Sequence, residues 1–199
     1  MQKQIKIIFI SVLLLLTPLA KAAVTPISIG LVPPLQFPPS DFDITGLRVS
    51  ALWGHHRQVY GLDIGGLGNI TDQDFVGIGL SGVFNYTKGN TTILGLQLAG
   101  LTNINTNKTD VYGLQATLGM NMNTAASKVV GVQLSLANIA GFTDIYGLQA
   151  GIYNKANEVY GLQLGLINVA SNLHGLQIGL LNFNAKGTFV VAPILNAGF

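Results

Sequence analysis

The residues that could support metal chemistry are few in this 199-residue chain, which has three histidines and no cysteine. His55 and His56 form a pair, but an organised metal site needs three or four convergent ligands, and the nearest acid in sequence is Asp63. Segment 71–74 (Thr-Asp-Gln-Asp) brings two carboxylates together as a calcium loop does, yet it lacks the further oxygen ligands and the closing glutamate. We therefore expect exposed turns at both places and predict no metal site.

Catalytic patterns are also missing from the sequence. The serines are scattered without a Gly-x-Ser-x-Gly elbow, and no Ser/His/Asp set suggests itself. We predict a protein that is not an enzyme, with no catalytic, cofactor-binding or metal-ligating residues and no cofactor. Arg48 and Asp63 stand where neighbouring repeat units carry glutamine, so they either form an ion pair facing one interior or are two unrelated residues near strand ends.

The composition excludes several classes of protein. The chain has 10 Lys+Arg and 8 Asp+Glu, is 9% charged and is 49% hydrophobic, the reverse of a disordered chain. Ten cations over 199 residues make no dense basic patch, so we expect no nucleic-acid partner. Ordinary soluble domains are roughly 25% charged, so this chain is not expected to be surrounded wholly by water.

The N-terminal residues have the pattern of an export signal. Lys3 and Lys6 precede the apolar run Ile7–Leu16, and Ala20-Lys21-Ala22 fits a small-x-small cleavage site. The run is too short to span a bilayer as a helix. We predict a signal peptide at 1–22, a proline-rich lead-in at 23–45, in which 27–31 could be a short edge strand, and a repeat-built domain at 46–199.

A repeat organises that domain. Each unit contains a glycine followed by an aliphatic residue, then in six units a glutamine two positions after the glycine, and in eight units a closing asparagine. The glycines are Gly46, Gly61, Gly77, Gly95, Gly113, Gly131, Gly147, Gly161 and Gly175. The glutamines are Gln97, Gln115, Gln133, Gln149, Gln163 and Gln177. The asparagines are Asn69, Asn85, Asn103, Asn121, Asn138, Asn154, Asn168 and Asn182.

Within a unit the apolar residues alternate with a period of two, which is typical of a β-strand. In segment 160–168 one face carries Tyr160 and three leucines, and the other carries Gly161, Gln163, Gly165 and Ile167. Turn-forming residues bracket each run and hold nearly every charge of the chain after residue 22, with Arg48 and Asp63 as exceptions. The sequence predicts one all-β domain of about ten strands.

Two architectures fit such strands. In an antiparallel closed β-barrel of an outer membrane, the tyrosine and leucine face would contact lipid and the glutamine face would line the inside. In a β-solenoid, each unit would be one coil, tyrosine and leucine would point inward, and equivalent Gln and Asn would stack into ladders. The drift in unit spacing from 15 to 18 to 14 counts against the barrel. Segment 189–199, alternating and ending in Phe199, is similar to the last strand of outer-membrane barrels.

The units Gly161–Asn168 and Gly175–Asn182, both of the form GLQ-x-GLxN, resemble a group of bacterial surface-repeat proteins. The resemblance covers about residues 45–199 and includes the variant 59–65 and the ending 193–199. It implies placement at the surface or outer membrane of a double-membrane bacterium, and brings no reaction or ligand.

We therefore favour a small outer-membrane β-barrel of about ten strands, exposed at the cell surface of a Gram-negative bacterium. Its role would be structural or interactive, without catalysis, and its partners would be outer-membrane lipid and the barrel-assembly machinery. The alternative is a secreted or surface-tethered β-solenoid that acts as a binding or adhesive module.

Overall fold

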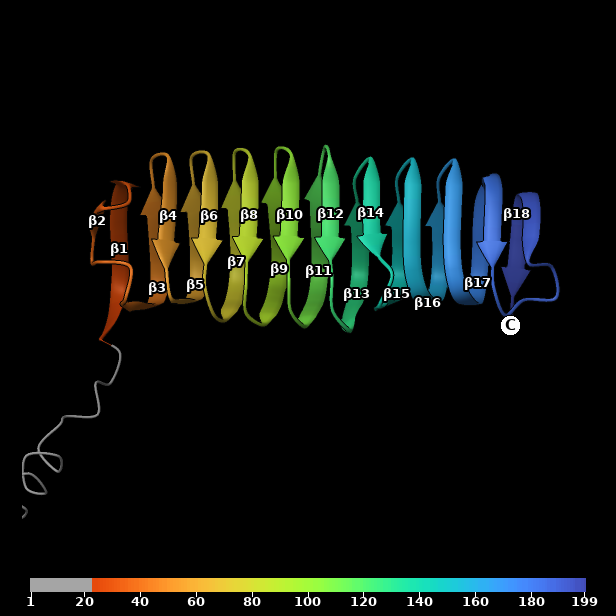
Figure 1. Cartoon of the computed structure of the whole chain (residues 1–199), viewed down its shortest axis with the longest axis horizontal. Helices are drawn as coiled ribbons and strands as arrows, with labels where there is room; N and C mark the ends of the chain where they lie inside the picture. The colour runs from red at the N-terminus through yellow and green to blue at the C-terminus, as the bar shows by residue number, and fades with distance from the viewer. Residues whose placement is uncertain (1–22) are drawn as a thin grey trace, which may run out of the picture.

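The computed structural model describes residues 23–199, and the predicted signal peptide lies outside them. The described chain coils into a β-solenoid of about ten turns, whose 18 strands form one continuous hydrogen-bonded set (Figure 1). Among these residues no helix has the length and apolar character needed to cross a membrane.

Each coil has a long strand, a sharp corner and a short strand, followed by a loop to the next coil. The long strands are β1 (Val24–Val32), β3 (Asp43–Ser50), β5 (Gln58–Gly65), β7 (Phe75–Ser81), β9 (Thr91–Ala99), β11 (Thr109–Thr117), β13 (Ser127–Leu134) and β15 (Thr143–Ala150). The short strands are β4 (Trp53–His56), β6 (Gly68–Thr71), β8 (Phe84–Thr87), β10 (Thr102–Asn105), β12 (Met120–Asn123) and β14 (Ala137–Ala140). In the last coils, β16 (Tyr153–Leu164) and β17 (Ile167–Asn184) run through short and long segments without a break.

Strands pair in parallel with the equivalent strand of the next coil, so identical residues stack. Gly113 lies opposite both Gly95 and Gly131, and Gln115 lies opposite both Gln97 and Gln133. The predicted antiparallel barrel is therefore wrong, and the β-solenoid alternative is confirmed. The physical reason is register: antiparallel neighbours run in opposite directions and cannot hold equivalent positions of successive units in contact along a whole strand.

The two faces of each strand are not the ones that the solenoid alternative assumed. Gln163 is fully buried between the two strand rows, whereas Tyr160 and Leu164 of the same strand point outward. The interior also holds one apolar ladder, formed by Ile44, Val59, Phe75, Ile93, Val111, Val129, Ile145, Val159 and Leu173. The fold thus combines the coiling of a solenoid with an exterior of leucine and tyrosine.

The repeated glycine is required by the backbone. Gly113 has φ +137°, and a Cβ there would lie 2.1 Å from the carbonyl oxygen of Gly95 in the preceding coil. Most of the equivalent glycines combine a positive φ with the same close approach. A side chain at this position would prevent the coils from stacking, so the glycine spacing marks the length of each coil.

Antiparallel strands lie at the two ends of the described chain. β2 (Leu35–Phe37) pairs with β1, and β18 (Val191–Gly198) pairs with the long part of β17. β1 also pairs in parallel with β3, so most of the expected lead-in belongs to the same sheet, and its strand is longer than the predicted 27–31. Pro193 in β18 has no N–H to offer at this outer edge, which limits pairing with a further strand.

Candidate functional site

An asparagine ladder runs through eight coils of the interior. Each asparagine except the last, Asn182, donates a hydrogen bond from Nδ2 to Oδ1 of the asparagine in the next coil, at 2.8–3.0 Å. The same Nδ2 also donates to a backbone carbonyl, as Asn121 does to Leu134 at 2.9 Å. Because an amide can donate and accept at once, a column of identical side chains satisfies itself without water.

A glutamine ladder runs beside it with the opposite orientation. Here Nε2 donates to Oε1 of the preceding coil, at 2.6–2.8 Å, from Gln177 back to Gln97. The open ends of the two ladders therefore lie at opposite ends of the solenoid: Oδ1 of Asn69 and Oε1 of Gln177 have no hydrogen-bond partner. The amide dipoles of the asparagine ladder and the glutamine ladder point in opposite directions and offset each other. The interior can therefore be polar over a long distance without a large net dipole.

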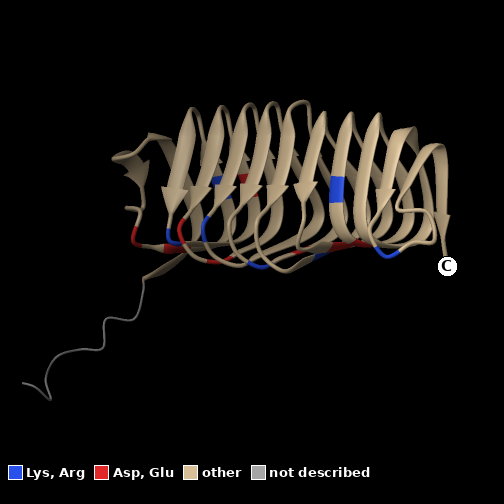
Figure 2. Ribbon diagram, turned by 45° about the vertical axis from the view of Figure 1, so that its right-hand side comes forward, with Lys and Arg blue, Asp and Glu red and all other residues tan. Residues whose placement is uncertain are grey.

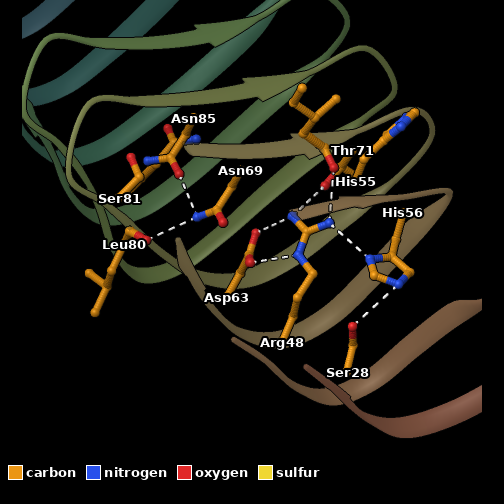
Figure 3. Close-up of polar contacts among 12 residues, drawn as sticks. Ser28, Arg48, His55, His56, Asp63, Asn69, Thr71, Leu80, Ser81 and Asn85 are labelled. Atoms are coloured by element: carbon orange, nitrogen blue, oxygen red, sulfur yellow. Dashed lines mark hydrogen bonds and ion pairs between the residues drawn. The ribbon is translucent and has the colours of Figure 1, made fainter. Parts of the chain in front are cut away.

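Near the N-terminal end an ion pair occupies the glutamine position (Figure 3). Arg48 is bidentate to Asp63, with Nε at 2.7 Å from Oδ1 and Nη2 at 2.5 Å from Oδ2, and both side chains are buried. Arg48 also donates from Nη1 to the carbonyl of Ile70 at 2.9 Å and from Nη2 to Oγ1 of Thr71 at 3.3 Å. Of the two alternatives that the sequence left open for Arg48 and Asp63, the structure shows the ion pair facing one interior. Burial raises the pKa of Asp63, and Arg48 opposes that shift.

His56 extends this cluster toward the first coil. Its Nδ1 lies 3.5 Å from Arg48 Nη1, and its Nε2 lies 3.2 Å from the carbonyl of Pro38 and 3.3 Å from Ser28 Oγ. A donor beside Nδ1 and a carbonyl beside Nε2 assign the neutral tautomer with its proton on Nε2. Burial, together with the nearby Arg48 charge, lowers the pKa of His56 to about 4.

The other candidate metal residues do not converge. His55 and His56 are adjacent in β4 and point to opposite faces, and His56 is fully buried rather than in the expected exposed turn. His55 Nε2 lies 2.6 Å from Asp72 Oδ2, and Lys88 Nζ lies 2.6 Å from Asp72 Oδ1. Asp72 is thus held by one histidine and one lysine from the coils on either side. Among residues 23–199 no group of three or more His, Asp or Glu could hold a metal ion.

The interior offers almost no free volume near these polar groups. One cavity of about 10 Å³ lies against Asp63, Asn69 and Gln97, beside Gly79, where the glutamine column has a gap. The ring of Phe75 fills most of that gap and would lie 3.4 Å from a Cβ on Gly79. Such a cavity has room for about one water molecule, so it is not a substrate site.

The outer surface is the distinctive feature of the molecule. A ladder of aliphatic side chains follows the edge at which long strands turn into short ones, which we call the corner edge. It comprises Leu52, Leu67, Leu101, Leu118, Leu136, Ile152, Leu166 and Leu180, with exposed fractions of 36–75%. Such an arrangement inverts the usual one, in which large apolar side chains are inside and amides outside.

Charged side chains collect at the opposite edge, where loops lead from each short strand to the next long strand; we call this the loop edge. Figure 2 shows the blue and red segments along it, at the bottom of the view. They include Arg57, Asp72, Asp74, Lys88, Lys108, Asp110, Lys128, Asp144 and Glu158. An exception on the outer surface is Lys155, which projects from the first half of β16.

Aromatic side chains stack on the long-strand face close to the loop edge. The rings of Tyr146 and Tyr160 are parallel with centroids 4.7 Å apart, and the ring of His174 follows at 4.5 Å. His174 therefore continues the tyrosine column, as its position in the repeat predicts. Lys128 lies over the ring of Tyr146, 4.6 Å from its centroid.

No protein-family model, curated protein or solved structure that was compared matches the chain.

From the sequence, the amide ladders were expected only for the solenoid alternative, and the Arg48–Asp63 pair was one of two alternatives. Two features of the site were missed. One is the set of further partners of Arg48, which come from β4 and β6. The other is the exposed aliphatic ladder of the corner edge, which continues the outward tyrosine and leucine face of the long strands. A signal for the second was present, since nearly every charge after residue 22 lies in turns.

Proposed function

We propose that this chain is a non-enzymatic, surface-exposed β-solenoid that works as a binding module through its apolar exterior. The observation that carries the proposal is the exposed aliphatic ladder of the corner edge, repeated in nearly every coil. Contiguous exposed apolar surface of this extent is typical of interaction sites. The packed interior supports a role for the outside, because the cavity among its polar ladders has room for about one water molecule.

We further propose that the module is exported and displayed at the surface of a double-membrane bacterium. The export signal predicted at 1–22 and the resemblance of the repeat to bacterial surface-repeat proteins support this location. The barrel hypothesis expected the barrel-assembly machinery as a partner. For a solenoid we propose an apolar partner instead.

Adhesion of whole cells to hydrocarbon tests this function with the full chain. On intact Gram-negative cells that produce the chain, protease added outside should digest it. These cells should also partition into hexadecane droplets more than cells without the chain. Changing Leu118 and Leu136 to serine should reduce partition at equal surface amounts, because it interrupts the middle of the ladder, where Leu118 is 75% exposed. Protection from external protease, or equal partition of all three strains, would overturn the proposal.

A further inference from the structure

The order of side chains across each coil suggests what the apolar exterior contacts. From the loop edge to the corner edge, the outward positions of one coil are Asp144, Tyr146, Leu148, Ala150 and Ile152. The next coil repeats the order with an acid, a tyrosine and three leucines at positions 158, 160, 162, 164 and 166. Charge, then tyrosine, then aliphatic side chains is the order found from the headgroups of a bilayer to its hydrocarbon.

The dimensions of a coil agree with this order. Six residues separate Tyr112 from Leu118, which at roughly 3.3 Å per residue is about 20 Å. Half of a hydrocarbon core about 30 Å thick is about 15 Å. A coil inserted edge-on would therefore place its tyrosine in the headgroup region of one leaflet and its corner leucine near the middle of the bilayer.

The shape of the apolar surface argues for lipid rather than a second protein. Exposed aliphatic side chains occur on the long-strand face (Leu94, Leu134), at the corner edge (Leu118) and on the last coil (Leu176, Leu181). A second copy of the chain would cover one face and leave the corner edge in water. A surrounding apolar solvent covers faces and edge together.

Lys155 fits the same arrangement. It lies two residues before Asn157, whose Nδ2 donates to Asp144 Oδ1 of the loop edge at 2.9 Å. The charged end of a lysine at this depth can extend to the headgroups while its methylene chain stays in the apolar region.

The interior makes such contact with lipid energetically possible. Backbone groups in hydrocarbon must be paired inside the protein, and here parallel pairing joins coil to coil. The Gln and Asn side chains are buried and bond to one another, so few polar groups along the coils face outward between the tyrosine column and the corner edge.

We propose that the solenoid inserts its corner edge into one leaflet of a lipid bilayer, with the loop edge remaining among the headgroups. This rests on the proposed function and names its partner as acyl chains. After residue 22 the chain has seven cations and eight anions, so binding should not require anionic lipid.

Flotation with neutral phosphatidylcholine vesicles tests the inference, using the purified chain produced from the full-length sequence. The chain should float with the vesicles at low and at high salt. The variant Leu118→Asp/Leu136→Asp should float less by about tenfold or more, because two carboxylates would enter hydrocarbon. The matched variant Asn107→Asp/Ala126→Asp adds the same charge to exposed loop-edge positions and should float like the unchanged chain.

Trp53, the single tryptophan, reports the depth of insertion because it follows the corner of its coil. Lipids brominated near the ends of their acyl chains should quench its fluorescence more than lipids brominated near the headgroups. The opposite ranking would overturn the insertion geometry.

The remaining outcomes separate this inference from the proposed function. If the chain stays unbound to vesicles while cells still adhere to hexadecane, the bilayer inference is wrong and the binding function stands. If the chain sediments as a dimer and does not bind vesicles, a second copy covers the apolar surface and the inference is overturned. Equal flotation of the two double variants, both folded by circular dichroism, would also overturn it.

Discussion

The first coils and the later coils fill the same interior position with different chemistry. From β9 onward it holds six stacked glutamines, whereas in β3 and β5 it holds Arg48 and Asp63. A glutamine both donates and accepts along the column, so the ladder can be extended by any number of coils. An arginine donates only and a carboxylate accepts only, so their pair closes on itself, and Gly79 in β7 separates it from the first glutamine, Gln97.

A closed ion pair of this kind needs additional hydrogen-bond partners. Arg48 donates to the Ile70 carbonyl and to Thr71, and His56 presents Nδ1 toward it. A glutamine such as Gln133 makes its main contacts with the equivalent residues of the two neighbouring coils. The early coils therefore depend on a particular set of residues, and the later coils depend on repetition.

Breaking the ion pair should have the largest effect. Arg48→Gln leaves the Asp63 carboxylate buried without its cation, which we expect to lower the free energy of unfolding by about 3–5 kcal/mol in urea titrations. The double variant Arg48→Gln/Asp63→Gln should recover most of this loss, because two amides replace two charges. A double variant no more stable than the single one would show that the pair is not exchangeable for the ladder.

Removing one amide from the middle of the ladder should have the next largest effect. Gln133→Ala deletes both a donor to Gln115 and an acceptor for Gln149, and it leaves a cavity, so we expect a loss of about 3 kcal/mol. Gln177→Ala at the open end should cost about 1 kcal/mol less, since its Oε1 has no partner. Equal losses at both positions would mean that the ladder bonds contribute little beyond packing.

Alternation in segments such as 160–168 was sufficient to predict strands and the two sets of faces. It could not decide between a barrel and a solenoid, because the alternation within one strand is the same whether its neighbour runs parallel or antiparallel. The drift in the spacing of the glycines was the informative signal. A solenoid tolerates coils of unequal loop length as long as the glycines of successive coils remain stacked. The inward side was ambiguous because leucine on the outside is unfavourable in water but favourable in lipid.

The partners of Arg48 were beyond sequence reasoning for a different reason. Thr71 is 23 residues away and Ile70 is 22, and they approach Arg48 only because β4 and β6 lie across the interior from β3. Such contacts depend on the circumference of the coil, which follows from the corner geometry rather than from the pattern within one strand. The Arg48–Asp63 pair could be put forward as one of two alternatives because both residues hold the same position in adjacent units.

Acid should destabilise the early coils before the later ones. We expect this effect on the free energy of unfolding to be smaller than those of the ion-pair and glutamine variants. The pKa of His56 is lowered from 6.5 to about 4 in the folded chain, so between these values the unfolded chain binds more protons than the folded one. This contribution to stability is therefore present above pH 6.5 and is lost as the pH falls toward 4. We expect the free energy of unfolding to fall by about 2 kcal/mol from pH 7 to pH 5 through this residue.

The variant His56→Thr separates this effect from the titration of other groups. Threonine occupies the equivalent position at Thr71 and Thr87, so the coil can accept it. The stability of the His56→Thr variant should change less between pH 7 and pH 5 than that of the unchanged chain. The variant lacks the contact with Arg48 at both pH values. If the two chains respond equally to acid, the buried histidine does not make the early coils acid-sensitive, and the contrast with the uncharged glutamine ladder then concerns the ion pair alone.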